Sequence, residues 1–348
     1  MRILITGNMG YVGPQVVSQL RATYPDAEIV GVDLGFFAHC LSGATEFPEN
    51  RLDTQYFADV RHVDATMLGG CDALVLLAAV SNDPMGAAYE SVTAQINNES
   101  CVRLAGLAKR AGTDHVVFAS SCSVYGFAEG GARSEDADLN PLTAYAHSKI
   151  DAENDLRDLA DDSFIVTCLR FPTACGMSPR LRLDLVLNDF VASAIATGNI
   201  EVLSDGSPWR PIIDTKDMAL AIDWAIGRTE SEGGAFLAIN AGSNESNYQV
   251  KELAEMVREV LPDVSVSINT DAPPDKRSYQ VDFGRYKSLA PDHQPRISLR
   301  QSVEDLAHGL KAMNFSDPKF RESQFVRLRV LNRLQEQGRI NDNLEWLQ

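Results

Sequence analysis

A glycine-rich turn near the N-terminus limits the possible folds more than any other feature of this sequence. The apolar run Arg2–Thr6 leads directly into Gly7-Asn-Met-Gly10-Tyr11-Val12-Gly13, and a helical pattern follows. Glycines between a strand and a helix allow a tight turn and bring backbone amides close to a diphosphate. The helix N-terminus then faces that anion. The turn therefore predicts a parallel α/β fold with a dinucleotide site at its first strand.

The rest of the first half repeats this strand–helix alternation. Short apolar runs predict buried strands at Arg2–Thr6, Glu28–Asp33, Ala73–Leu77, His115–Ser120 and Phe164–Arg170. Helical patterns lie between them at Gly13–Arg21, Tyr89–Ala111 and Tyr145–Leu159. Strands that alternate with helices indicate a doubly wound parallel sheet of the Rossmann type.

The texture of the sequence changes after Arg170, where glycine, proline and arginine cluster. We expect residues 1–171 to form the dinucleotide-binding domain, residues 172–315 mainly a smaller substrate-binding subdomain, and residues 316–348 a polar, amphipathic helical tail. Helices are expected at Leu185–Ala196, Met218–Gly227, Gln249–Val260 and Ser302–Leu310. A strand at Phe236–Asn240 could return to the first sheet, so the boundary is not a clean cut.

Composition excludes several classes of partner. A formal net charge of -17 repels nucleic-acid phosphates, although local arginines can still bind a small phosphorylated ligand. No apolar run approaches the roughly 20 residues of a membrane helix, and no signal peptide is evident, so we expect a cytoplasmic protein with no membrane partner. The six cysteines are scattered without a CxxC pair, which favours reduced thiols and no metal site.

Three further features carry chemistry. Asp33 ends the second predicted strand, where a carboxylate binds the ribose hydroxyls of NAD and repels the 2′-phosphate of NADP. Tyr145 and Lys149 share one helical face, and an ammonium near a phenol lowers the pKa of the phenol. Ser121 lies in a serine-rich turn after a strand, at the sheet edge where ligands bind. Each feature alone also has a bland interpretation as a turn cap, an exposed pair or a polar loop.

In combination, these features resemble the extended short-chain dehydrogenase/reductases, the family of sugar-nucleotide epimerases, dehydratases and reductases. Asp59-Val60 is similar to the family's adenine-contacting pair, and Leu77-Ala78-Ala79 to its "HLAA" motif. Ile96-Asn97 is similar to "VN". Arg170–Gly176 is similar to "RxxNxYG", with Thr173 for Asn and Cys175 for Tyr, and Trp209–Asp217 to "RDFxHVxD".

The resemblance implies roles for individual residues. Tyr145 would be the catalytic acid/base, Lys149 its support and Ser121 the hydroxyl partner. The NAD site would comprise Gly7, Gly10, Tyr11, Val12, Gly13, Asp33, Asp59, Val60, Leu77, Ala78, Ala79, Tyr145, Lys149 and Phe171. A nucleotide-diphosphate sugar would contact Ser81, Ser123, Thr173, Arg180, Arg182, Asn188, Arg210 and Arg277, with arginine suited to its diphosphate.

Departures from the family pattern narrow the reaction. The 4,6-dehydratases carry an Asp-Glu pair directly after the catalytic Thr, whereas Cys122 and Ser123 occupy these positions here. Elimination of water needs an acid and a base, and serine is poor at both, so dehydration is disfavoured. Cys122 could act as a thiol acid/base, but we expect a packed core cysteine.

Three functions follow from the resemblance. The first is an NAD-dependent nucleotide-sugar epimerase, at C4, which oxidises the sugar transiently and returns the hydride to the other face. The second is a reductase of NDP-4-keto-6-deoxysugars with the same residues. The third is a non-catalytic dinucleotide-binding protein, which the presence of Tyr145, Lys149 and Ser121 disfavours. The family also suggests a homodimer through the helices that carry Leu104, Leu107, Ala108, Ile150 and Leu156, although these side chains fit packing within one chain equally well.

Overall fold

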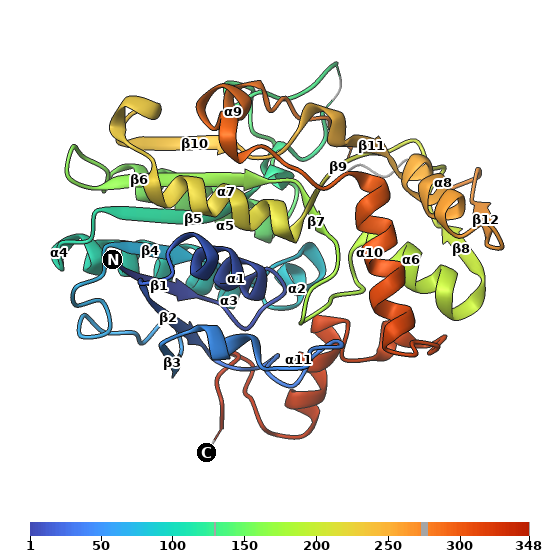
Figure 1. Cartoon of the computed structure of the whole chain (residues 1–348), viewed down its shortest axis with the longest axis horizontal. Helices are drawn as coiled ribbons and strands as arrows, with labels where there is room; N and C mark the ends of the chain where they lie inside the picture. The colour runs from blue at the N-terminus through green and yellow to red at the C-terminus, as the bar shows by residue number, and fades with distance from the viewer. Residues whose placement is uncertain (129, 273–277, 348) are drawn as a thin grey trace.

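A parallel sheet covered by helices on both faces organises the computed structural model (Figure 1). The structure describes all residues except 129, 273–277 and 348. The strands of the large sheet follow the order β10-β6-β5-β4-β1-β2-β3. Their bounds are β1 Arg2–Thr6, β2 Glu28–Asp33, β3 Thr54–Phe57, β4 Ala73–Leu76, β5 His115–Ser121, β6 Ile165–Phe171 and β10 Phe236–Asn240. The predicted doubly wound parallel sheet is confirmed.

The predicted strands of the first half all occur, with ends that shift by at most one residue. β3 was not predicted, because its sequence lacks an apolar run. It lies at the edge of the sheet and pairs only with β2, and none of its four residues is fully buried. β10 runs parallel to β6, with Phe236 opposite Val166, at the other edge. The chain therefore returns to the first sheet after a long excursion.

The helices divide between the two faces of the sheet. α1 (Gly13–Thr23) and α7 (Thr215–Gly227) pack together on one face and share an apolar core with the strands. α3 (Glu90–Ala94), α4 (Ser100–Arg110) and α5 (Ala144–Arg157) cover the other. The helix predicted over Tyr89–Ala111 is interrupted by a π-helical turn at Gln95–Glu99. This turn carries Asn97, whose buried side chain accepts from the Val80 amide and donates to the Val80 carbonyl and the Ser148 hydroxyl.

The second part of the chain builds a smaller unit beside the carboxyl ends of the strands (Figure 1). β7 (Thr173–Cys175), β9 (Trp209–Asp214) and β11 (Asn247–Gln249) form one small sheet. β8 (Asn199–Val202) and β12 (Ser265–Ile268) form another. α6 (Val186–Thr197), α8 (Val250–Val260) and α10 (Leu299–Ala312) enclose its own apolar core. Three further helices are labelled in Figure 1: the short helices α2 (Asp83–Ala88) and α9 (Gly284–Leu289), and α11 (Arg327–Glu336) near the C-terminus.

The tail differs from the continuous helix expected over residues 316–348. Its α-helix is α11 (Arg327–Glu336), preceded by a 3₁₀ turn at Phe320–Glu322. Gly338 follows the helix with φ +64°, a left-handed conformation that ends helices and that glycine adopts without strain. After it, Ile340 and Trp346 pair in an isolated antiparallel bridge. A polar composition alone did not reveal this stop.

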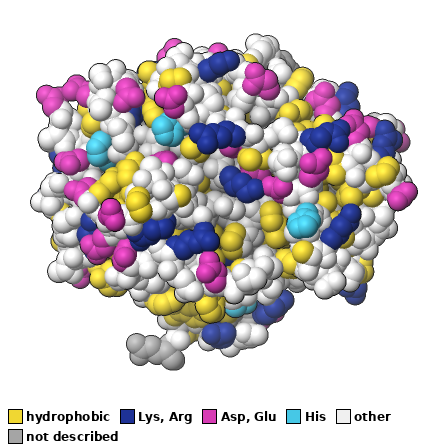
Figure 2. Space-filling model, viewed as in Figure 1, with side chains coloured by type: hydrophobic (Ala, Val, Ile, Leu, Met, Phe, Trp, Pro, Cys, Tyr) yellow, Lys and Arg dark blue, Asp and Glu magenta, His cyan; other side chains and the backbone are white. Residues whose placement is uncertain are grey.

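The apolar side chains proposed for a dimer face mostly pack within the chain. Leu104, Ala108 and Leu156 belong to the buried core, and only Leu107 and Ile150 stay partly exposed. Figure 2 shows acidic and basic side chains interspersed on the face seen in Figure 1, with no continuous basic surface there. Among the described residues, no helix combines the length and the apolar character that crossing a membrane requires.

Candidate functional site

One large cavity of about 1010 Å³ lies between the sheet and the smaller unit. The β1–α1 turn, the ends of β2, β4 and β5, and the start of α5 contribute to its walls, and so do residues of the second part. Ligands of parallel α/β sheets bind at the carboxyl ends of the strands, where this cavity opens. Its volume is large enough for a dinucleotide and a second ligand side by side.

The glycine turn forms a cradle at one wall of the cavity. Gly7 has φ +74°, and a Cβ on it would lie 2.5 Å from the Ala78 amide nitrogen. A Cβ on Gly13 would lie 2.2 Å from the Asn8 carbonyl oxygen, so neither position accepts a side chain. Within the described chain, the amides of Tyr11 and Val12 donate to no backbone carbonyl or side chain. Free amides at a helix start suit a diphosphate, so the residues present fit a bound dinucleotide.

Asp33 lies at the carboxyl end of β2 and lines the same cavity. Its carboxylate accepts hydrogen bonds from the Gly35 amide at 2.8 Å and the Met9 amide at 3.1 Å. These bonds orient the group and favour its charged form, although burial is the larger influence and raises its pKa above the usual value. The geometry matches the expected contact with a ribose.

Of the other residues expected around the adenosine, four line the cavity and one does not. Val60, Leu77, Ala78 and Ala79 line the cavity. Asp59 does not line it, because its carboxylate is engaged by the Arg61 guanidinium. The structure therefore places Asp59 outside the cavity lining, with Arg61 as its ion-pair partner.

Ser121, Tyr145 and Lys149 converge on the cavity from two elements. Ser121 ends β5 and lies beside Tyr145, which is in the first turn of α5. Thr143 caps α5 and thereby fixes where the helix starts. One turn later, Lys149 is buried and donates to the Ala119 carbonyl at 2.8 Å, and its ammonium lies 5.6 Å from the centre of the Tyr145 ring. This arrangement can hold a hydroxyl and move its proton.

Burial dominates the pKa of both ionisable groups. It raises the pKa of Tyr145 to about 12, opposed by the nearby Ser121 hydroxyl. It lowers the pKa of Lys149 to about 8. Burial therefore outweighs the lowering of the tyrosine pKa that Lys149 was expected to cause, and further positive charge in the cavity would favour the phenolate.

We expect Lys149→Met to stabilise the cofactor-free protein at pH 7 by about 1 to 2 kcal/mol, after allowance for the lost hydrogen bond. The unfolded chain holds the Lys149 proton up to its ordinary pKa of 10.5, but the folded chain only up to about 8. Below pH 8 the penalty on folding is complete, and between these values stability rises with pH. Urea unfolding should show a gain for the variant at pH 7 that shrinks toward pH 10.

Lys311→Met, at an exposed position of α10, is the matched control and should change little. A Lys149→Met variant no more stable than the parent at pH 7 would contradict the burial argument.

A second polar group lies near Tyr145. The Arg182 guanidinium binds Asp184 through two bonds of 2.9 Å and donates to the Ser81 hydroxyl at 2.9 Å. Asn82 donates to the same Asp184 carboxylate at 3.0 Å. The pKa of Asp184 is held below its usual value by Arg182 against the effect of burial. The pair stays ionised and mutually neutralised beside the place where a sugar would meet Tyr145.

The remaining residues expected at the substrate are only partly brought together. Ser123, Thr173 and Arg210 line the cavity, and so does Phe171, which was expected at the NAD site. Arg180 is fully buried outside it and binds Glu49 at 2.6 Å. Asn188 is also fully buried, and its side chain bonds the Gly176 amide, the Tyr11 hydroxyl and the Arg182 carbonyl.

These contacts make Arg180 and Asn188 supports of the cavity wall. Both were expected at the substrate from the resemblance, but Arg180 and Asn188, the latter in α6, do not line the cavity. Arg277 lies outside the described residues. The Cys122 thiol is fully buried and donates to the Arg170 carbonyl at 3.1 Å, and the residue does not line the cavity, which matches the expected core cysteine.

Several cavity residues had no signal in the sequence. Asp189 and Arg321 form a bidentate ion pair at the cavity wall. Arg327 and Leu344 reach the cavity from the tail, which was expected to be a polar, amphipathic helical segment. Asp189 directly follows Asn188, but Arg321, Arg327 and Leu344 lie far along the chain from the recognised motifs, so only the tertiary fold brings these three to the site.

Comparisons with known proteins agree with this geometry. The model of the NAD dependent epimerase/dehydratase family matches residues 3–242. UDP-glucuronic acid decarboxylase 6 of Arabidopsis thaliana is 26% identical over 314 residues, which cover 87% of each chain.

Solved structures share the fold. MoeE5 in complex with UDP-glucuronic acid and NAD has a TM-score of 0.76 and 23% identity, and covers 89% of this chain and 99% of its own. The UDP-glucose-4-epimerase from Stenotrophomonas maltophila with bound NAD and formylated UDP-arabinopyranose has a TM-score of 0.75 and 21% identity, over 90% and 99%. With the glycine cradle, Asp33 and the Ser–Tyr–Lys group in place, this chain belongs to the NAD dependent epimerase/dehydratase family, and NAD is its cofactor.

Proposed function

We propose that the chain is a nucleotide-sugar 4-epimerase that keeps its NAD throughout the cycle. The observation that carries the proposal is the convergence of Ser121, Tyr145 and Lys149 on one cavity. The loop directly after Ser121 contributes no acidic residue. A serine at position 123 and a buried thiol at 122 do not supply the proton donor that elimination requires. Asp184, held as a carboxylate by Arg182, does not supply one either.

The roles of the residues follow from their positions. Tyr145 takes the proton of the sugar hydroxyl, and Ser121 holds the same oxygen by a hydrogen bond. Lys149 places its ammonium near the phenol ring and favours the phenolate. Bound NAD supplies the hydride acceptor and donor, and its oxidised ring adds positive charge. After the keto-sugar turns over, Tyr145 returns the proton to the new hydroxyl, so no proton or hydride is lost over the cycle.

The charges near Tyr145 favour a neutral sugar. Asp184 already neutralises Arg182, so a uronate carboxylate would gain little attraction and would lie near a second carboxylate. The Arabidopsis relative is named a UDP-glucuronic acid decarboxylase, an activity on a uronate. Decarboxylation is therefore the competing function to test, beside reduction of a 4-keto-6-deoxysugar.

The test uses the purified protein in D₂O with UDP- and dTDP-linked hexoses and UDP-glucuronate, without added dinucleotide. We expect protein-bound NAD, interconversion of 4-epimers, faster turnover of neutral sugars, and no deuterium at C5. Decarboxylation or dehydration would leave solvent deuterium at C5, because both form a carbanion-like centre there. Activity that appears only with added NADH and a keto-sugar would overturn the epimerase in favour of a reductase.

A further inference from the structure

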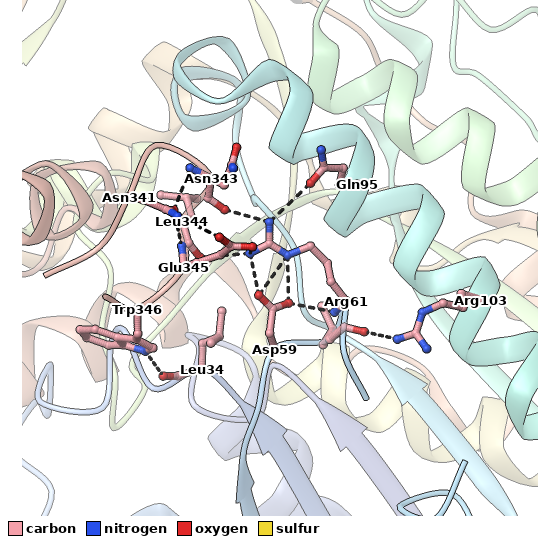
Figure 3. A network of polar contacts seen from close by, with 11 residues as sticks. Leu34, Asp59, Arg61, Gln95, Arg103, Asn341, Asn343, Leu344, Glu345 and Trp346 are labelled. Atoms are coloured by element: carbon pink, nitrogen blue, oxygen red, sulfur yellow. Dashed lines mark hydrogen bonds and ion pairs between the residues drawn. The ribbon is translucent and has the colours of Figure 1, made fainter. Parts of the chain in front are cut away.

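The loop after α11, residues Gln337–Leu347, is a folded element, and we call it the C-terminal loop. Asn341 organises it: its amide donates to the Glu345 carbonyl at 3.0 Å, and its side-chain oxygen accepts from the Glu345 amide at 2.9 Å. Ile340 and Leu344 are buried. Figure 3 shows this loop folded against Leu34 and Asp59, which come from the ends of two neighbouring strands of the large sheet.

Arg61 joins the C-terminal loop to the sheet. Its guanidinium binds the Asp59 carboxylate at 2.6 Å and donates to the carbonyls of Asn343 at 2.8 Å and Leu344 at 3.2 Å (Figure 3). The Arg61 and Asp59 side chains are only 9% and 8% exposed, so water competes weakly for these bonds. One side chain thus holds a carboxylate from the sheet and two carbonyls from a segment some 280 residues away.

Trp346 provides a second attachment. Its indole N–H donates to the Leu34 carbonyl at 2.8 Å, directly after Asp33 (Figure 3). Its ring also contacts Phe36 with a centroid distance of 5.0 Å. The loop is therefore fixed beside the carboxylate that faces the ribose.

Leu344 shows that the attachment serves the cavity. Its side chain lines the cavity together with Ala58, Val60 and Phe36, the residues that surround the expected adenosine end. Its backbone has φ +52°, a left-handed conformation that a branched apolar residue rarely adopts. Such strain costs of order 1 kcal/mol and persists where the surroundings impose it.

We propose that the C-terminal loop, held in place by Arg61, forms a wall of the adenosine site and retains NAD between turnovers. Arg61 is a positioning residue: it acts on the cofactor through Leu344. The inference depends on the NAD site alone and stands whatever sugar chemistry the enzyme performs.

The test measures ligand binding without turnover. In Arg61→Gln, we expect NAD to dissociate about tenfold faster or more and AMP to bind correspondingly weaker, while the affinity for nicotinamide mononucleotide stays within about twofold. Arg61→Lys should not restore retention, because one ammonium cannot replace the planar fork that serves three acceptors. Arg258→Gln, which removes an exposed ion pair on α8, is the matched control and should leave all three ligands unaffected.

Leu344→Gly is the second variant, because it removes the apolar side chain from the cavity and glycine accepts the left-handed backbone without strain. It should weaken AMP and speed the release of NAD, while the affinity for nicotinamide mononucleotide stays within about twofold. The lost burial of Leu344 exceeds the relieved strain, so a lower melting temperature is expected as well. If AMP and nicotinamide mononucleotide weaken equally in both variants, the loop has only a structural role. If neither ligand weakens, the loop is not part of the adenosine site. Either result would overturn the proposal.

Discussion

Tyr145→Phe is expected to lower turnover of the sugar nucleotide by about 10²- to 10⁴-fold, the range that a positioned acid/base contributes. The variant loses one hydroxyl, which lies beside Ser121 at the cavity, and keeps the ring at the start of α5. NAD content and melting temperature should therefore stay near those of the parent protein. Turnover of 4-epimers and the NAD released on denaturation are measured on the same sample.

Tyr56→Phe is the matched control, because Tyr56 lies on β3 at the far edge of the sheet and does not line the cavity. It should keep full turnover. Near-normal activity of Tyr145→Phe with intact NAD binding would remove Tyr145 from the mechanism and with it the proposed function.

The second large effect concerns stability. Glu153→Gln is expected to reduce the free energy of unfolding by about 3 to 5 kcal/mol, because it leaves a buried guanidinium without its counter-charge. Arg170 binds Glu153 at 2.6 and 3.0 Å, and the Ser120 hydroxyl donates to the same carboxylate at 2.5 Å. Both charged side chains are at most 5% exposed. Urea unfolding at pH 7 measures the loss.

The double variant Glu153→Leu with Arg170→Met separates charge from packing. It removes both charges together, so it should be less destabilised than Glu153→Gln, although the Tyr125 hydroxyl, which accepts from Arg170 at 3.1 Å, loses a partner. A loss below about 1 kcal/mol in Glu153→Gln would show that the pair contributes little.

This buried pair also bears on the site. Ser120, which directly precedes Ser121, donates to Glu153 of α5. Cys122, which directly follows Ser121, donates its thiol to the Arg170 carbonyl of β6. The residues on both sides of Ser121 are thus tied to β6 and α5. We expect Glu153→Gln to disturb the position of the Ser121 hydroxyl as well as the stability of the fold.

The parts of the site that could be predicted from the sequence are local. Gly7 and Gly13 were recognisable because nearby backbone leaves no room for a Cβ at either position. The backbone that crowds Gly13 is a few residues away, and the backbone that crowds Gly7 follows the neighbouring strand. Asp33 is the last residue of a buried strand, so its place at the carboxyl end of the sheet follows from the extent of that strand. Tyr145 and Lys149 share a helix face because four residues span about one turn.

Inward and outward orientation within irregular loops was not predictable in this way. Arg180 and Arg182 are two residues apart in one loop, yet Glu49 binds the first outside the cavity and Asp184 holds the second inside it. Asn188, in α6, was expected to meet a ligand, but its hydrogen bonds end on Tyr11 and two backbone groups. Glu49 and Tyr11, which hold Arg180 and Asn188, are distant from them in the sequence, whereas Arg182 is held by Asp184 two residues away.

The sequence by itself determined the parallel sheet, the cofactor cradle and the Ser–Tyr–Lys group, because these depend on backbone sterics and periodicities that act over a few residues. Only the tertiary structure decided that Arg61, two residues along the chain from its partner Asp59, also binds the carbonyls of Asn343 and Leu344, and that the tail folds back to line the cavity. Sequence spacing alone can place Arg61 beside Asp59, but the two carbonyls belong to a segment some 280 residues away. Such contacts depend on the three-dimensional approach of distant segments, which no local periodicity encodes.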